Sequence, residues 1–236
     1  MLVIGRRGAA GLAPENTLDA MRAGLQAGAD ILELTVQLTH DNVLVLVHDL
    51  HTVKSKRRLP ICRKNYDELV NIAENRPSII KLEEVLDRYF GTVLLNIQLK
   101  SRASGEHLVR LLKSKYIKHP SDWDNVLISS FKVGELLRIR LMSRKANLAL
   151  IHSDNPFAFI AYHRLVKFTA VGFHRLHINR LALEIAHKAQ LFTYVYTIDR
   201  PDALSHLASL NFDGVVTDYP DKISAALEKQ AAEKSD

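Results

Sequence analysis

One carboxylate, one imidazole and three cationic side chains stand in or just after short apolar runs within the first 100 residues. They are Arg6, Arg7, Glu33, His48 and Lys100. An imidazole takes up and releases a proton near neutral pH, whereas guanidinium and ammonium groups donate hydrogen bonds and attract anions. These residue types suit an anionic ligand, and His48 is the one best able to transfer a proton. Whether they meet depends on the elements that carry them.

Short apolar, β-branched runs alternate with segments of helical periodicity along most of the chain. The runs are 2–4, 30–37, 93–97, 126–129, 148–152, 169–173, 192–197 and 214–217, and the helical segments include 17–27, 82–89, 106–115, 132–141, 181–189 and 201–210. Eight strands alternating with helices over 236 residues predict an α/β fold, a single (β/α)₈ TIM barrel that forms one domain over residues 1–236. An open doubly wound sheet is the competing fold, but no glycine-rich nucleotide fingerprint follows the first run.

A ninth apolar run, 43–47, follows the second so closely that it must fold back as a β-hairpin, because a parallel crossover needs about a dozen residues. A turn over residues 39–42 would pair Leu38 with Val43 and, counting outward, Glu33 with His48. That pairing places a carboxylate beside an imidazole at the carboxyl end of a barrel strand, where barrel enzymes place their active sites.

Five short motifs follow one another in an order and spacing that chance does not readily produce. They are Arg6-Arg7-Gly8, Pro14-Glu15-Asn16-Thr17, Glu33-Leu34-Thr35-Val36, His48-Asp49 and Ile97-Gln98-Leu99-Lys100. Together they resemble the glycerophosphodiester phosphodiesterase family, and the resemblance continues through residues 126–131 and 213–220. Three polar positions depart from the family pattern: Arg6 stands in place of a catalytic histidine, Thr35 in place of an aspartate and Gln98 in place of a glutamate.

The resemblance implies that Mg²⁺ or Ca²⁺ is held by Glu33 and by the carboxylates that Thr35 and Gln98 replace. It also implies that two histidines transfer protons and that Arg7 and Lys100 contact the phosphate. Hard cations prefer several anionic oxygens, so we expect Glu33 to hold a metal weakly and the chain to need no metal cofactor. Arginine cannot act as a base at neutral pH, which leaves His48 as the surviving catalytic residue.

Two functions follow from this comparison. One is a catalytically impaired member of the family, a pseudoenzyme, that binds a small anionic phosphoester through Arg6, Arg7 and Lys100. The resemblance implies a role in lipid metabolism. The alternative is an active, metal-dependent phosphoric diester hydrolase, with Mg²⁺ or Ca²⁺ on Glu33, that releases glycerol 3-phosphate and an alcohol. Arg6 either takes over the charge of the missing metal or forms a salt bridge to Glu33, and Lys100 shares a strand face with Gln98, so it should point into the same site.

Composition leaves several partners open. Thirty-two basic against 26 acidic residues give a net charge of +6, which permits attraction to anions without selecting one. The densest basic stretch contains Lys54, Lys56, Arg57, Arg58, Arg63 and Lys64. It is either a solvated surface or a contact with an anionic membrane surface, and nucleic acid is not expected because no aromatic residue interleaves it. The oligomeric state stays open.

Cys62 is the only cysteine, so no disulfide can form within the chain. No apolar run approaches the roughly 18 to 20 residues of a membrane span, and the first predicted strand leaves no room for a signal peptide. We therefore expect a cytoplasmic protein.

Overall fold

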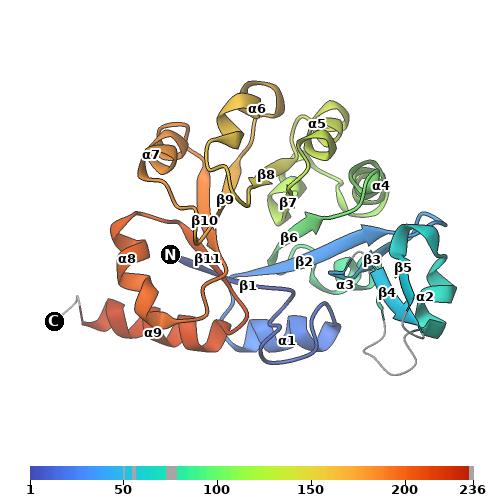
Figure 1. The fold of residues 1–236 in the computed structure, drawn as a ribbon, viewed down its shortest axis with the longest axis horizontal. Coiled ribbons are helices and arrows are strands. Elements are labelled where there is room, and N and C mark those ends of the chain that lie inside the picture. Colours follow the sequence, from blue (N-terminus) through green and yellow to red (C-terminus); the bar gives the residue numbers. More distant parts are fainter. Residues whose placement is uncertain (50, 55–56, 73–78, 234–236) are drawn as a thin grey trace.

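The computed structural model describes residues 1–49, 51–54, 57–72 and 79–233, with the backbone alone for 51–54 and 57–59. Eight parallel strands close into a barrel in the order β1, β11, β10, β9, β8, β7, β6, β2, with β2 pairing back to β1 (Figure 1). Their bounds are β1 Leu2–Gly5, β2 Ile31–Leu38, β6 Leu94–Leu99, β7 Val126–Ser130, β8 Asn147–Ile151, β9 Ala170–His174, β10 Phe192–Tyr196 and β11 Gly214–Thr217. The predicted barrel is confirmed.

Helices surround the barrel on its outside (Figure 1). They are α1 Leu18–Gln26, α2 Tyr66–Ile72, α3 Leu82–Tyr89, α4 Ser104–Leu111, α5 Val133–Met142, α6 Ala158–Val166, α7 Arg180–Lys188, α8 Leu204–Ser209 and α9 Pro220–Ala232, with the short helices η1 Ile61–Arg63, η2 Leu112–Tyr116, η3 Pro120–Asn125 and η4 Pro201–Ala203. The helical segments given above do not include α2 or α6. Helix α6 buries Phe159 and Val166 but also exposes Ile160, Tyr162 and Leu165, so its apolar residues do not mark a single buried face.

Apolar side chains fill part of the barrel interior. Ile4, Ile31, Leu127, Tyr194 and Val216 pack there among smaller residues, while a larger apolar cluster fills the space between the strands and the helices. Tyr194 is fully buried, and its ring fits because β9 carries a glycine opposite it: a Cβ at Gly172 would lie 2.7 Å from the ring. Polar side chains are therefore left to the carboxyl ends of the strands.

The hairpin after β2 forms, but its predicted register is wrong by one residue. Strand β3, Leu44–Leu46, runs antiparallel to β2 and pairs Leu38 with Leu44 rather than with Val43. The turn takes five residues instead of four, because the Thr39 hydroxyl accepts a hydrogen bond from the Val43 amide at 2.9 Å and Asn42 adopts a φ of 64°. A one-residue shift reverses which face each side chain of a strand occupies.

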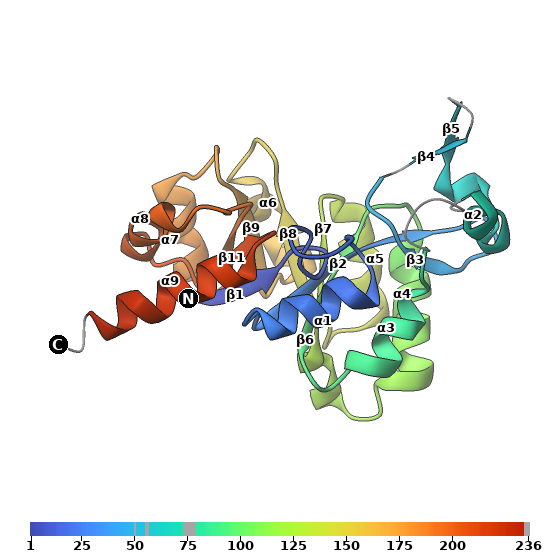
Figure 2. The same cartoon turned by 90° about the horizontal axis from the view of Figure 1, so that it is seen from below.

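The basic segment after β3 forms a separate two-stranded antiparallel sheet of β4, His51–Lys54, and β5, Arg57–Pro60. It projects beside α2 at the edge of the barrel (Figure 2). Lys56, which the sequence placed in the basic stretch, lies outside the described residues. Over the described part of the chain, no helix has the length and apolar character needed to cross a membrane.

Candidate functional site

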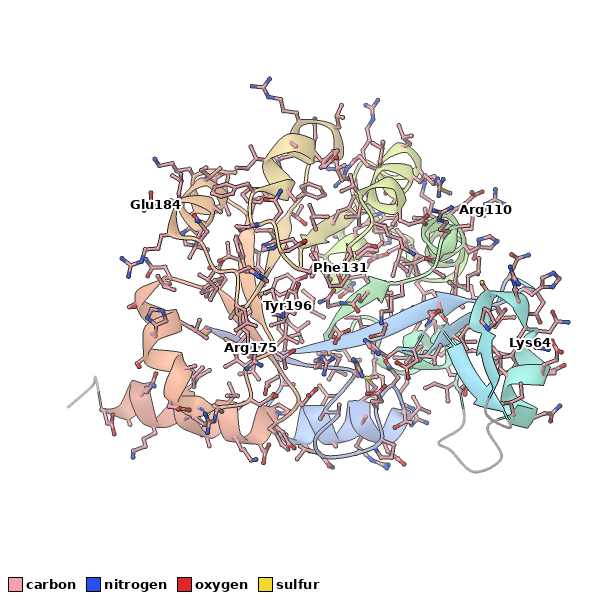
Figure 3. The ribbon with its side chains drawn as sticks, viewed as in Figure 1. Lys64, Arg110, Phe131, Arg175, Glu184 and Tyr196 are labelled. Carbon is pink, nitrogen blue, oxygen red and sulfur yellow. The ribbon has the colours of Figure 1, made fainter. Side chains whose placement is uncertain are left out.

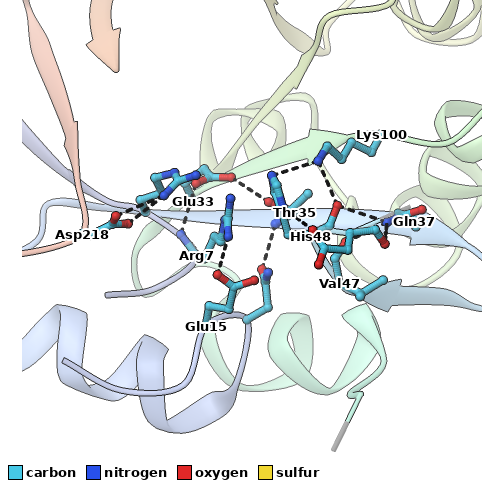
Figure 4. Close-up of polar contacts among 12 residues, drawn as sticks. Arg7, Glu15, Glu33, Thr35, Gln37, Val47, His48, Lys100 and Asp218 are labelled. Atoms are coloured by element: carbon cyan, nitrogen blue, oxygen red, sulfur yellow. Dashed lines mark hydrogen bonds and ion pairs between the residues drawn. The ribbon is translucent and has the colours of Figure 1, made fainter. Parts of the chain in front are cut away.

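A cavity of about 330 Å³ opens at the carboxyl ends of the strands. Its lining comprises Arg6, Arg7, Glu33, His48, Asn96, Gln98, Lys100, Phe131, Ile151, Tyr194, Tyr196, Thr197 and Val216. Of the residues expected at the site, Arg6, Arg7, Glu33, His48, Gln98 and Lys100 line this cavity, whereas Thr35 is fully buried and does not line it. Figure 4 shows their polar contacts.

Arg6 follows β1 and forms its ion pair with Asp218, not with Glu33. Its Nη1 donates to both carboxylate oxygens of Asp218 at 3.1 Å (Figure 4). The alternative that paired Arg6 with Glu33 was therefore wrong, and Asp218 was missed. Barrel closure explains the partner: β11 lies beside β1, so the residues that follow these two strands are neighbours. A guanidinium has five N–H donors, and Asp218 occupies only one of the Arg6 nitrogens.

Glu33 lies within β2, and both of its oxygens are occupied. Oε2 accepts the Arg7 amide at 3.1 Å, and Oε1 accepts the Thr35 hydroxyl at 3.2 Å. The side chain is deeply buried, and burial raises the pKa of its carboxyl above the ordinary value, although the charges of Arg6 and Arg7 oppose that rise. Burial therefore favours the neutral acid. Within the described ranges, no group of three or more His, Cys, Asp or Glu side chains is placed to hold a metal.

Arg7 is held by the loop that precedes α1. Its Nη1 donates to Glu15, and its carbonyl accepts the Asn16 amide at 2.9 Å. Asn16 Oδ1 accepts the Thr35 amide at 3.0 Å, which ties the loop to β2. Thr17 caps α1, as its Oγ1 accepts the Ala20 amide at 3.1 Å. The second motif of the sequence thus fixes the position of Arg7.

His48 and Lys100 contact each other on the far wall of the cavity. Lys100 Nζ lies 2.8 Å from His48 Nε2 and donates to the His48 carbonyl at 2.9 Å, while His48 Nδ1 lies 3.1 Å from Asp49 Oδ1 (Figure 4). Since an ammonium can only donate, this network assigns the imidazole proton to Nδ1. Burial, with the charges of Arg7 and Lys100, lowers the pKa of His48, and burial and Arg7 lower the pKa of Lys100.

Gln37 holds the segment that carries His48, and the sequence analysis missed it. Its Nε2 donates to the carbonyls of Val47, His48 and Asp49 at 3.1, 3.3 and 2.7 Å. The side chain is almost completely buried. Gln37 continues the alternation of polar residues that Glu33 and Thr35 begin along β2, and this was the available signal, because a buried polar side chain requires hydrogen-bond partners.

Two aromatic side chains form the upper wall of the cavity. Tyr196 ends β10 and meets the ring of Phe131 edge-on, with centroids 6.3 Å apart (Figure 3). The Tyr196 hydroxyl donates to the carbonyl of His152. Phe131 is 44% exposed, so the pair borders an open mouth instead of sealing the barrel end.

The remaining histidines near this rim stand apart from the cavity. His152 is buried against Phe173, and burial lowers its pKa to about 4, so its imidazole is neutral at pH 7. His174 and His177 pack against each other with centroids 5.4 Å apart. None of the three lines the cavity, which leaves His48 as its only histidine among the described residues.

The fold and the site define a (β/α)₈ barrel whose mouth combines guanidinium, ammonium, imidazole and a buried carboxylate. Residues 7–222 match the model of the glycerophosphoryl diester phosphodiesterase family, and the chain belongs to that family.

Two bacterial relatives show the extent of the similarity. YhdW of Bacillus subtilis (strain 168) is 29% identical over 239 residues, covering 94% of this chain and 96% of its own length. A glycerophosphodiester phosphodiesterase of Caldanaerobacter subterraneus is 26% identical over 242 residues, with 94% and 96% covered. Among solved structures, an Oleispira antarctica phosphodiesterase in complex with the product sn-glycerol-3-phosphate has the same fold, with a TM-score of 0.83, 24% identity and 97% of each chain covered.

Proposed function

We propose that this chain binds a small phosphate ester at the barrel mouth and hydrolyses it poorly or not at all. The observation that carries the proposal is the charge of the cavity wall, where Arg6, Arg7 and Lys100 face a single carboxylate, that of Glu33. The carboxylates that pair with the two guanidinium groups, Asp218 and Glu15, do not line the cavity. An anion in the cavity would therefore meet cations on several sides.

The donor set does not fit a divalent cation. Glu33 is the one carboxylate in the lining, both of its oxygens already accept hydrogen bonds, and the Thr35 hydroxyl donates to it instead of facing the cavity. Gln98 offers one neutral oxygen. Mg²⁺ and Ca²⁺ are bound by several oxygens, usually including more than one carboxylate. We infer that fixed positive side chains, above all Arg6, supply the charge that a metal supplies in the family.

The proton-transfer chemistry is also reduced. In the family pattern a histidine stands where this chain has Arg6, and a guanidinium cannot accept a proton at neutral pH. General acid–base catalysis contributes about 10² to 10⁴ in rate. His48 keeps a lone pair on Nε2, to which Lys100 Nζ donates at 2.8 Å. A bound phosphate would draw the ammonium toward its own oxygens and free the imidazole.

The Oleispira antarctica protein supports the class of ligand, because it holds sn-glycerol-3-phosphate within the same fold. In this chain, a phosphate between Arg6, Arg7 and Lys100 would leave a glycerol moiety next to the rings of Tyr196 and Phe131. Aromatic faces pack against the C–H groups of such a moiety. The proposed ligand is therefore glycerol 3-phosphate or a diester that contains it.

Isothermal titration of glycerol 3-phosphate, Mg²⁺ and Ca²⁺ into the purified chain tests the proposal. We expect heat from glycerol 3-phosphate and none from either cation. Release of glycerol 3-phosphate from a glycerophosphodiester at enzyme-like rates in the presence of Mg²⁺ or Ca²⁺ would overturn the proposed loss of catalysis. That outcome would support the hydrolase alternative, with His48 as its proton carrier.

Contact of the basic segment with an anionic membrane surface stays a prediction. If the prediction is correct, vesicles of anionic lipid should bind the chain in a salt-sensitive way. Substitutions at Arg6 or Lys100 should leave that binding intact.

A further inference from the structure

A second cavity, of about 630 Å³, lies beside the first at the barrel mouth. It is bordered by the segment that joins β9 to α7, by the segment after β10 and by α8. Thr197 lines both cavities, so they share a wall. Arg175, which lines the second cavity, donates its backbone amide to the carbonyl of Tyr196 at 3.0 Å, and Tyr196 lines the first (Figure 3).

The wall of the second cavity is rich in cations. Arg175, Arg180 and Arg200 line it together with His206, and no ion pair of these arginines forms within the residues that the structure describes. The one carboxylate in the lining belongs to Asp199. Three guanidinium groups against this carboxylate give the wall a net charge of +2 when His206 is neutral.

Asp199 forms no ion pair with these arginines among the described residues. Its Oδ1 accepts the Thr217 hydroxyl at 3.0 Å and the Asp218 amide at 2.8 Å. These bonds hold the carboxylate against the end of β11, where Asp218 pairs with Arg6 of the first cavity. The carboxylate thus supports the wall between the cavities, whereas the three arginines are exposed lining residues with no ion pair in the described part of the chain.

Arg180 stands at a position that is unfavourable for a cation. It is the first residue of α7, a helix of nine residues with no acidic side chain in its first turn. The amino-terminal end of a helix carries partial positive charge and favours anions. An anion in this cavity would neutralise the charge of Arg180 and would also interact favourably with the amino-terminal end of α7. The floor below is apolar and includes Ile198 and Leu207.

We propose that the second cavity binds a carboxylate or phosphate carried on the alcohol portion of a glycerophosphodiester whose central phosphate lies in the first cavity. This inference rests on the proposed function, and it defines the ligand class as diesters with a second anionic group. Such a ligand would extend across Thr197, with its two charges held by the two sets of cations.

Glycerophosphoserine and glycerophosphoethanolamine test this assignment, because they differ only in one carboxylate. We expect calorimetry to show about tenfold tighter binding of glycerophosphoserine, the effect of one partly exposed ion pair with helix support. The combined variant Arg175→Ala, Arg180→Ala and Arg200→Ala should lose this preference and keep its affinity for glycerophosphoethanolamine. Arg164→Ala, which removes an exposed arginine from α6, is the matched control and should change neither.

Several outcomes separate this inference from the proposed function. Equal affinity of the unmodified chain for the two diesters refutes the second anion site and leaves the first intact. If the unmodified chain prefers glycerophosphoserine and Lys100→Met loses affinity for both diesters, the proposed function and the second anion site are both supported. If neither diester binds, the proposed function fails, and the second cavity is judged by NMR. Inorganic phosphate should then shift the Nε–Hε signals of Arg175 and Arg180, and unchanged signals refute the site.

Discussion

Replacement of Arg6 by methionine is the most direct perturbation of the proposed anion site. Methionine keeps much of the length and volume of the arginine side chain but removes every donor. Arg6 uses Nη1 for Asp218, and its side chain lines the cavity. A hydrogen bond that involves a charged group contributes about 1.5 to 3 kcal/mol. We expect Arg6→Met to weaken glycerol 3-phosphate binding by about 2 kcal/mol, or roughly thirtyfold in Kd.

The same substitution should change stability little. The side chains of Arg6 and Asp218 are 28% and 22% exposed, and ion pairs that water reaches contribute about 1 kcal/mol or less. Calorimetric titration at low salt measures the affinity, and thermal unfolding shows that the variant is folded. Arg22→Met is the matched control, because Arg22 pairs with Asp19 on the exposed face of α1 and lies outside the cavity. If Arg6→Met binds glycerol 3-phosphate within twofold of the unmodified chain, then Arg6 does not replace the metal and the reasoning fails.

Three other predictions concern catalysis, titration and stability. The combined change Arg6→His, Thr35→Asp and Gln98→Glu should raise the rate of Mg²⁺-dependent hydrolysis of glycerophosphocholine by at least about 10², the lower end of the rate factor that one acid–base group contributes. A decrease would mean that the present residues form an alternative catalytic set. The NMR signals of the His48 ring should report a pKa below the ordinary value of a histidine, because burial and the charges of Arg7 and Lys100 lower it. Bound phosphodiester should raise this pKa, so affinity should rise as pH falls through it; a pKa above the ordinary value in the free chain contradicts this environment. Arg140→Met should lower the free energy of unfolding in urea by about 3 kcal/mol, because the buried guanidinium donates to five backbone carbonyls between α5 and β9; a loss below about 1 kcal/mol would contradict this.

Much of the fold could be predicted from local pattern. The alternation of β-branched runs with helical segments predicted all eight barrel strands, and β8, β9 and α3 fall within two residues of their expected bounds. The short spacing between the runs at 30–37 and 43–47 required a hairpin, which formed. These features follow from residue periodicity and connection length, both of which are local properties of the chain.

The apolar pattern of the sequence could not predict details that depend on hydrogen bonding inside a turn. The hairpin register shifted by one residue because the Thr39 hydroxyl and the left-handed backbone at Asn42 closed a longer turn. No apolar pattern distinguishes a four-residue from a five-residue turn. Helix α6 was absent from the expected segments for a different reason, since Ile160, Tyr162 and Leu165 are exposed and its apolar residues do not mark one face.

The sequence by itself determined the barrel, the family resemblance and the set of polar residues at the strand ends. Only the tertiary structure decided how those residues pair: Arg6 with Asp218, 212 positions away, His48 with Lys100, and the Glu33 carboxyl with Thr35 and the Arg7 amide. The reason is that pairing depends on which strands become neighbours: closure brings the last strand beside the first for Arg6 and Asp218, and β6 lies beside β2 for Lys100 and His48. Burial, which shifts the pKa values of Glu33 and His48, likewise exists only once the chain is folded.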